Sequence, residues 1–202
     1  MRGDGYEDTP ARIRAEVAAS PGALWITRRR RVPDRAFDRL ERRLRDGLEY
    51  GVAIRLEDAL GRILLVRMDP RVAWTASWVT PGGGANPTEA PQAAIRREVW
   101  EETGGRVKGE RLWKVFHETV TNSRGQAVRW DFLQYTGRWS GGVPRPRVPG
   151  EIAEARWFRR LPNAMAFRAD WLRPPRQRSR RPDLADSRLP AARQKPEKDW
   201  PA

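Results

Sequence analysis

The stretch from residue 81 to residue 105 constrains this chain more than any other part of its sequence. Three glycines follow Pro81, and Pro91 opens a segment of helix-forming residues. Proline suits the first position of a helix, where its missing N–H donor is not needed. Gly104 can adopt the left-handed backbone conformation that often ends a helix. We therefore predict a glycine-rich turn followed by a short helix from residue 91 to about residue 103.

Three glutamates share one face of this predicted helix. Glu98, Glu101 and Glu102 are spaced i, i+3 and i+4, so their carboxylates are neighbours on the helix surface. Glu98 and Glu102 repel each other at a cost of roughly 0.2–0.5 kcal/mol. Both also lie near the helix C-terminus, where the helix dipole disfavours anions. Such unfavourable arrangements are expected at functional sites, and the alternative interpretation is an acidic, solvated helix face.

A divalent cation would relieve this repulsion. Carboxylate oxygens suit Mg²⁺ or Mn²⁺, and Mg²⁺ commonly bridges a few carboxylates to substrate phosphates. Zinc is disfavoured, because the chain has no cysteine and His117 is its single histidine. The glycines before the helix, among them Gly82 and Gly83, allow the backbone to approach an anion closely. The stretch is therefore a candidate magnesium or manganese site.

The composition favours an anionic partner. The 40 Lys and Arg residues exceed the 26 Asp and Glu residues, which gives a net charge of +14. Such a charge attracts nucleotides or nucleic acid. The absence of cysteine excludes disulfides and fits a reducing compartment. No segment approaches the ~20 apolar residues of a membrane span, and the N-terminus lacks a secretion-signal pattern. We expect a cytoplasmic protein that does not enter a membrane.

Hydrophobic periodicity predicts further elements on both sides of the central stretch. Apolar residues at helical spacing predict a helix from residue 33 to about residue 48, and a short helical segment is predicted at 12–19. The run Arg28–Arg31 between them is either a solvated basic segment or a contact to phosphate or nucleic acid. Strands are predicted at 50–56, 63–68, 74–80, 113–120, 127–135 and 155–158, followed by a helix at 161–172 and a disordered tail from 173.

The spacing of residues in the central stretch resembles the Nudix box, over residues 83–105. Gly83 is followed after five residues by Glu89 and, after seven more, by the sequence Arg97-Glu98-Val99-Trp100-Glu101-Glu102-Thr103-Gly104. One position departs from the family pattern, because Gly105 stands where the family has an aliphatic residue. We expect that change to affect local packing rather than chemistry.

The resemblance implies a fold and a domain plan. It implies an α/β protein with a Nudix-type α/β/α sandwich around a mixed β-sheet. It places the Nudix domain at residues 49–172, between a basic, helical N-terminal extension at 1–48 and a basic tail at 173–202. We identify no family counterpart for the two ends.

The resemblance also implies a reaction. Most Nudix proteins use Mg²⁺ or Mn²⁺ to hydrolyse a diphosphate linkage, in a nucleoside diphosphate derivative or a nucleoside triphosphate, by attack of water at phosphorus. By position, Glu98, Glu101 and Glu102 would bind the metal, and Glu98 is one candidate for the base that deprotonates the water. Arg97 would orient a box glutamate through a charge-assisted hydrogen bond. The other box positions, and the glycine just before the box, would shape the loop or support the metal site: Gly82, Gly83, Glu89 and Gly104.

In some family members the base comes from a loop after the box. Glu118, Glu151 and Glu154 are the candidates here, and Glu151 is favoured because it lies in a loop rich in glycine and proline. Each of the three also reads as an ordinary surface residue. Trp78 lies close to the box and can stack on a nucleobase, although a packing role is the alternative.

The sequence does not specify the substrate within the family. Beyond the box, at residues 119–123, it has neither the proline of many ADP-ribose hydrolases nor the tyrosine of many dinucleoside-polyphosphate hydrolases. We predict a pyrophosphohydrolase with a nucleotide-type substrate. Nucleic acid is a further candidate partner, and the family suggests a homodimer. The alternative is a non-catalytic Nudix-fold module that binds a nucleotide or RNA, and the intact set of box glutamates favours the enzyme.

Overall fold

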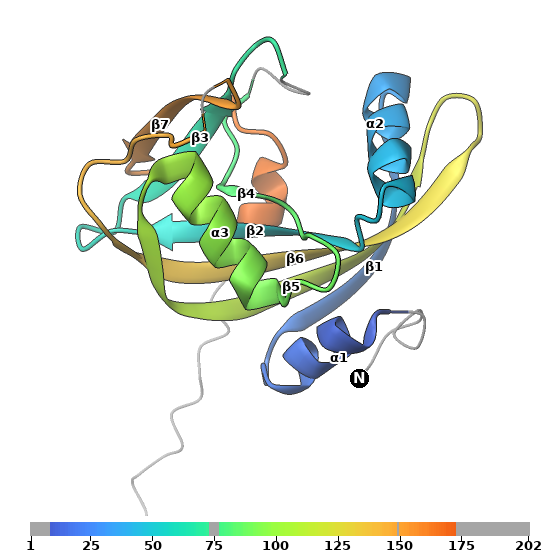
Figure 1. The fold of residues 1–202 in the computed structure, drawn as a ribbon, viewed down its shortest axis with the longest axis horizontal. Helices are drawn as coiled ribbons and strands as arrows, with labels where there is room; N and C mark the ends of the chain where they lie inside the picture. The colour runs from blue at the N-terminus through green and yellow to red at the C-terminus, as the bar shows by residue number, and fades with distance from the viewer. Residues whose placement is uncertain (1–8, 73–76, 149, 173–202) are drawn as a thin grey trace, which may run out of the picture. The chain divides into compact units, whose positions relative to one another are not determined.

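A computed structural model describes residues 9–72, 77–148 and 150–172. Met1–Trp171 form one compact unit and Leu172–Ala202 a second, of which only Leu172 is described. The predicted disordered tail and residues 74–76 of a predicted strand lie outside the described residues. The elements, in chain order, are α1 (Ala11–Ala18), β1 (Leu24–Arg31), α2 (Asp34–Arg45), β2 (Tyr50–Glu57), β3 (Ile63–Met68), β4 (Gly82–Gly84), α3 (Pro91–Thr103), β5 (Arg106–Thr121), β6 (Ala127–Ser140), β7 (Ile152–Phe158) and the 3₁₀ helix η1 (Arg168–Trp171) (Figure 1).

The strands form one mixed sheet. Their order is β1-β5-β6-β2-β3-β7, and β4 pairs with β2 away from this path. β1 is parallel to β5 and β2 is parallel to β6, whereas the other pairs are antiparallel. The predicted hairpin of β2 and β3 is confirmed, although the two strands pair only near the turn. A mixed sheet with helices confirms the predicted α/β class.

Both faces of the sheet are covered. Val99 of α3 and Val52 of β2 share one buried cluster. The next residue of β2, Ala53, points to the opposite face and joins a second cluster with Trp171 of η1. Of the helices in the described residues, none has the length and apolar character needed to cross a membrane.

The helix predicted in the central stretch is confirmed as α3. Pro91 is its first residue, and Gly104 ends it in the left-handed conformation, with φ of 68°. The N–H of Gly104 donates to the carbonyl oxygen of Trp100 at 2.8 Å. The two predicted N-terminal helices are also present, but α2 ends at Arg45 because the chain turns at Gly47, whose φ is 96°.

The arginine run lies in a strand that the sequence did not predict. β1 is at the edge of the sheet, and its side chains alternate between two faces. Arg28 and Arg30 are half-buried and donate to Glu118 Oε1 at 2.6 Å and 2.7 Å, whereas Arg29 and Arg31 are exposed. The interpretation as a solvated segment is therefore wrong for two of the four arginines. Because four identical residues show no alternation of polarity, the sequence pattern that predicts a strand is absent from this run.

The helix predicted at residues 161–172 is wrong, because only Arg168–Trp171 form a 3₁₀ turn. Before that turn, the backbone bonds to residue 78 instead of forming a helix. The N–H of Trp78 donates to the carbonyl oxygen of Ala164 at 3.0 Å, and the N–H of Ala166 donates to the carbonyl oxygen of Trp78 at 2.9 Å. Phe167 has φ of 53°, a conformation that an α-helix does not accommodate. The apolar residues of this segment therefore pack on the sheet without forming a helix.

Candidate active site

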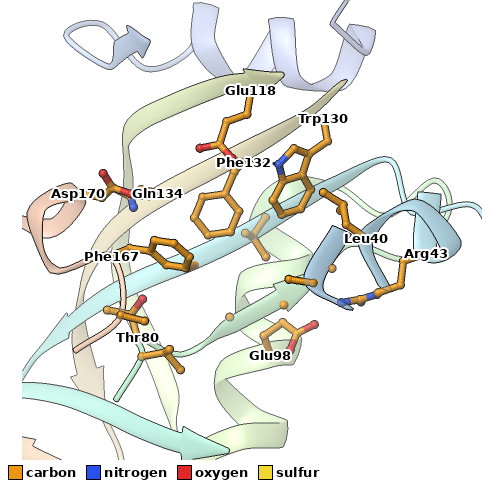
Figure 2. A pocket seen from close by; sticks show the side chains of 18 of the residues that line it. Leu40, Arg43, Thr80, Glu98, Glu118, Trp130, Phe132, Gln134, Phe167 and Asp170 are labelled. Atoms are coloured by element: carbon orange, nitrogen blue, oxygen red, sulfur yellow. Dashed lines mark hydrogen bonds between the residues drawn. The ribbon is translucent and has the colours of Figure 1, made fainter. Parts of the chain in front are cut away.

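A cavity of about 280 Å³ lies against β2, β5 and β6, between the sheet and helix α2. Figure 2 shows Glu98 at one end of this cavity and Phe132 and Trp130 at the other. Arg43 of α2 and Phe167, which precedes η1, lie on opposite sides (Figure 2). The cavity therefore has an acidic end, an aromatic end and a basic side.

The three glycines form the short strand β4, paired with β2, instead of the predicted turn. A Cβ atom at Gly83 would lie 2.6 Å from Glu98 Oε1 and 2.7 Å from Glu98 Oε2. Only a glycine at this position leaves space for that carboxylate. The neighbouring residue, Gly82, donates its N–H to Glu102 Oε2 at 2.8 Å. Strand β4 thus places two box glutamates at the cavity.

Burial is the main influence on the pKa of these two glutamates. It raises the pKa of Glu98, although the nearby charge of Arg97 opposes that shift. It raises the pKa of Glu102 well above its usual range, and the negative charge of Glu98 raises it further. The charge of Glu151 acts in the same direction on both. The three carboxylates therefore share one electrostatic environment at the acidic end of the cavity.

Arg97 connects the glutamates of this region. Its Nε and Nη2 atoms donate to Glu89 Oε1 and Oε2, both at 3.0 Å. Its Nη1 atom donates to Glu98 Oε1 at 2.8 Å and to Glu101 Oε2 at 2.9 Å. Nη2 also donates to the carbonyl oxygen of Gly84 at 2.9 Å. One guanidinium group thus fixes the orientation of three carboxylates relative to β4.

Two of the three predicted metal ligands line the cavity. Glu98 and Glu102 do, whereas Glu101 points to Arg97 and is not a lining residue. Within the described ranges, no group of three acidic or histidine side chains has an arrangement that holds a metal ion. Because Glu101 does not line the cavity, a cation bound by all three glutamates would require the Glu101 side chain to turn toward Glu98 and Glu102.

Comparison with known proteins identifies the family. The model of the NUDIX domain matches residues 47–174. This chain belongs to the Nudix family. The α2 helix lies before the matching region, and the box lies within it. The lining residues of β2, β5 and β6 also lie within the matching region, whereas the lining residues of α2 lie outside it.

Curated Nudix relatives match only part of this chain. It is 39% identical over 95 residues to a MutT-like protein of Streptomyces ambofaciens, covering 47% of this chain and 53% of that protein. It is 32% identical over 107 residues to an RNA pyrophosphohydrolase of Bartonella clarridgeiae, covering 47% and 62%. It is 49% identical over 66 residues to diphosphoinositol polyphosphate phosphohydrolase 2 of Rattus norvegicus, covering 33% and 37%. The chain thus spans less than two thirds of the length of these relatives.

Among solved structures, a MutT NUDIX hydrolase of Burkholderia pseudomallei is 25% identical, with a TM-score of 0.49 over 59% of this chain and 90% of that one. A NUDIX hydrolase of Nitrosomonas europaea is 29% identical, with a TM-score of 0.45 over 55% and 72%.

The one departure from the Nudix box has a structural explanation. The indole ring of Trp139 lies where a side chain at Gly105 would be. Trp139 also packs edge-on against Trp157, with ring centroids 5.7 Å apart. The tryptophan on β6 therefore fills the space that an aliphatic residue of the box would take.

The three candidates for the base lie in different surroundings. Glu151 is exposed and lines the cavity beside Glu98 and Glu102. Glu118 also lines it but is paired with Arg28 and Arg30. Glu154 pairs with Arg67 at 2.7 Å and is not a lining residue. Position and accessibility favour Glu151.

Two further residues of the sequence analysis do not line the cavity. Trp78 packs edge-on against Phe158, with ring centroids 4.9 Å apart, next to the second buried cluster. His117 Nδ1 lies 2.8 Å from Asp131 Oδ1, and its ring stacks on Trp25. These locations favour packing roles.

Sequence analysis missed several of the residues that line the cavity outside the box. They come from α2, from β6 and from the segment before η1, and their spacing from the box follows no pattern that predicts a shared site. Phe132 and Gln134 lie two residues apart on β6, and this alternation places them on the same face as Trp130. The missed lining residues that matter below are Arg39, Arg43, Trp130, Phe132, Gln134 and Phe167.

Proposed function

We propose that this Nudix protein is a pyrophosphohydrolase that cleaves the diphosphate linkage of a nucleoside triphosphate or a nucleoside diphosphate derivative. The observation that carries the proposal is the convergence of Glu98, Glu102 and Glu151 on one end of a cavity of about 280 Å³. Glu98 and Glu102 are buried carboxyl groups with raised pKa beside a cavity, which is typical of a catalytic site.

The carboxylates fit a divalent cation by their chemistry. Glu98 and Glu102 are buried neighbouring carboxyl groups, and hard oxygen donors suit Mg²⁺ or Mn²⁺. Glu98 and Glu102 would hold the cation, with Glu101 as a third ligand when its side chain turns toward them. When bound, the cation would supply positive charge to the phosphate groups and lower the pKa of a coordinated water.

The residues of the chain have separable roles in this proposal. Glu151, or alternatively Glu98, accepts a proton from the attacking water. A new bond forms between the water oxygen and phosphorus, and the bond from phosphorus to the bridging oxygen breaks. Arg97 keeps Glu98 oriented through the hydrogen bond at 2.8 Å. The backbone of β4, which carries no side chains, leaves room for the Glu98 carboxylate over Gly83.

The other end of the cavity favours a nucleoside as the group attached to the phosphates. Trp130 and Phe132 offer aromatic rings there, and Phe167 offers one on the side opposite Arg43. A base stacked on such a ring gains roughly 1–3 kcal/mol. Two of the named relatives are, by name, an RNA pyrophosphohydrolase and a diphosphoinositol polyphosphate phosphohydrolase, and an inositol ring has no aromatic face. The aromatic lining therefore supports a nucleotide over an inositol substrate.

A panel of nucleoside triphosphates, nucleoside diphosphate sugars and dinucleoside polyphosphates tests the proposal. With Mg²⁺ present, we expect release of phosphate, pyrophosphate or a nucleoside monophosphate from at least one member, and loss of turnover in Glu102→Gln. Glu151→Gln should lower kcat while Glu154→Gln should not. A folded wild-type protein that binds nucleotide or RNA tightly but turns over no substrate would instead indicate the non-catalytic module.

A further inference from the structure

Helix α2 lies outside the region that matches the NUDIX family, yet it forms one side of the cavity. We propose that Arg43 and Arg39 of α2 bind the phosphate groups of the substrate, which makes the N-terminal extension part of the active site. This inference rests on the proposed function, because it names further contacts to the same substrate.

The helix is fixed in place at several points. The N–H and hydroxyl groups of Ser123, in the turn between β5 and β6, donate to Asp34 Oδ1 at 2.9 Å and 2.7 Å. Arg124 of the same turn pairs with Asp38. The side chain of Phe37 is completely buried. These contacts hold α2 against the domain, so its arginines are positioned before a substrate binds.

Arg43 lies next to the box. Its guanidinium group occupies the space over Gly84, and the carboxylate of Glu98 occupies the space over the preceding glycine, Gly83. Both side chains line the cavity (Figure 2). A phosphate group held near Glu98 would therefore be within the reach of the Arg43 side chain.

Arg39 lies one helical turn before Arg43 and also lines the cavity. Its Nη1 atom donates to the carbonyl oxygen of Val72 at 2.8 Å. Burial lowers the pKa of Arg39, the charge of Arg43 lowers it further, and the charge of Glu151 opposes both. The two arginines thus repel each other at the cavity, and a bound anion would relieve that repulsion.

Neither arginine forms an ion pair with any side chain in the described part of the chain. Arg28 and Arg30, by contrast, are engaged by Glu118 and Asp170. Arginine presents planar pairs of N–H donors that match phosphate oxygens. Of the cations at this cavity, Arg39 and Arg43 are therefore the ones available to a diphosphate or triphosphate.

Kinetics of Arg43→Ala and Arg39→Ala, on the substrate found in the panel, test the assignment. Loss of a charge-assisted hydrogen bond should raise KM by about tenfold or more, with kcat changed much less. Arg42→Ala is the matched control, because Arg42 is exposed on the same helix and does not line the cavity. Arg43→Lys should recover part of the affinity, and thermal unfolding should show that all variants are folded.

Calorimetric binding of ATP to the Glu102→Gln protein separates this inference from the proposed function. If Arg43→Ala and Arg39→Ala in that background weaken binding about tenfold, the inference holds even where the wild type shows no turnover. If both variants leave KM and affinity unchanged, the inference is overturned, even where turnover confirms the proposed function.

A separate observation concerns Gln134, which is 1% exposed and lines the cavity. Its Oε1 atom has no hydrogen-bond partner among the described residues. A buried acceptor without a partner is unfavourable, and a ligand that donates to it would remove that penalty. With Phe132 two residues away on the same strand face, the geometry assigns Gln134 to recognition of a nucleobase amino group.

Nucleotides that differ at one group test this assignment. We expect the Glu102→Gln protein to bind ATP more tightly than ITP, or CTP more tightly than UTP, by about fivefold or more. Gln134→Leu in that background should remove the difference while retaining most of the affinity that the phosphate groups provide. Gln92→Leu, on the surface of α3 and outside the cavity, is the control. An amino preference that persists in Gln134→Leu, or that is absent with Gln134 in place, would overturn the assignment.

Discussion

The carboxylate of Glu98 lies in the space that a side chain at Gly83 would fill, with Oε1 2.6 Å from the position of a Cβ atom. The glycine and the glutamate are fifteen positions apart in the box, and their spacing alone does not explain why the first must be a glycine. The contact supplies a physical reason. The glycine is required there by the volume of the carboxylate, since the backbone of residue 83 is not in the left-handed region.

Gly83→Ala should therefore impair turnover without unfolding the protein. Alanine can adopt this backbone conformation, so the clash is confined to the Glu98 carboxylate, and a displacement of about 1 Å can lower a rate about 10²-fold. We expect kcat to fall at least tenfold by this estimate, measured on the substrate found in the panel. Gly142→Ala is the control, because a Cβ atom there meets nothing within 4 Å. Wild-type kcat in Gly83→Ala would contradict the steric explanation.

Glu102→Gln should raise stability at neutral pH in buffer that contains EDTA. Burial raises the pKa of Glu102 in the folded protein, so the native state favours the protonated carboxyl. The stability that this proton contributes is fully present below the pKa of the unfolded chain and is lost as the pH rises through the folded pKa. The neutral glutamine does not suffer that loss.

Thermal unfolding at pH 5 and pH 8 checks this expectation. The Tm of Glu102→Gln relative to the wild type should increase with pH, and each 1 kcal/mol corresponds to about 2–4 °C. Glu154→Gln, which alters an exposed ion pair, should show little change. A variant that is less stable than the wild type at pH 8 would contradict this expectation, because it would mean that contacts in the folded protein stabilise the charged form of Glu102.

Arg97→Lys should lower both activity and stability although it retains the charge. Lysine cannot reproduce the paired donation to Glu89 at 3.0 Å together with the bonds to Glu98 and Glu101. Loss of such bonds costs about 1.5–3 kcal/mol each at most, so we expect a lower midpoint of denaturant unfolding and a reduced kcat. Arg96→Lys, which alters an arginine exposed to solvent on the same helix, serves as the comparison. Equal effects of the two substitutions would argue against a positioning role for Arg97.

Gly105→Val should destabilise the protein by about 1–3 kcal/mol, because the new side chain overlaps the indole of Trp139. Trp139→Ala should also be destabilising, since it removes the packing against Trp157. In the double variant the valine can occupy the vacated space, so the combined cost should be smaller than the sum of the two. Urea unfolding of the four proteins measures this coupling. Strictly additive costs would mean that Trp139 does not replace the missing aliphatic residue.

Local features of the chain were predictable to different degrees. The beginning of α3 at Pro91, its end at Gly104 and the shared face of its glutamates follow from neighbouring residues alone. Strand β1 was not predictable, because the four residues Arg28–Arg31 have the same polarity. Only in the folded protein do Glu118 and Asp170 pair with two of them and so distinguish the two faces of the strand. The predicted helix at 161–172 failed for a related reason. Its backbone hydrogen bonds go to Trp78, which is distant in sequence.

The sequence by itself therefore determined the Nudix box, the helix that carries it and the family to which the chain belongs, since these depend on residue identities at short spacing. The tertiary structure decided which box glutamates reach the cavity. Arg97 turns Glu101 away, while β4 places Glu98 and Glu102 at its acidic end. The tertiary structure also brought Arg43 from α2 and Gln134 from β6 to the same cavity. Such contacts join segments far apart in the chain, and they form only when the sheet and the helices pack together.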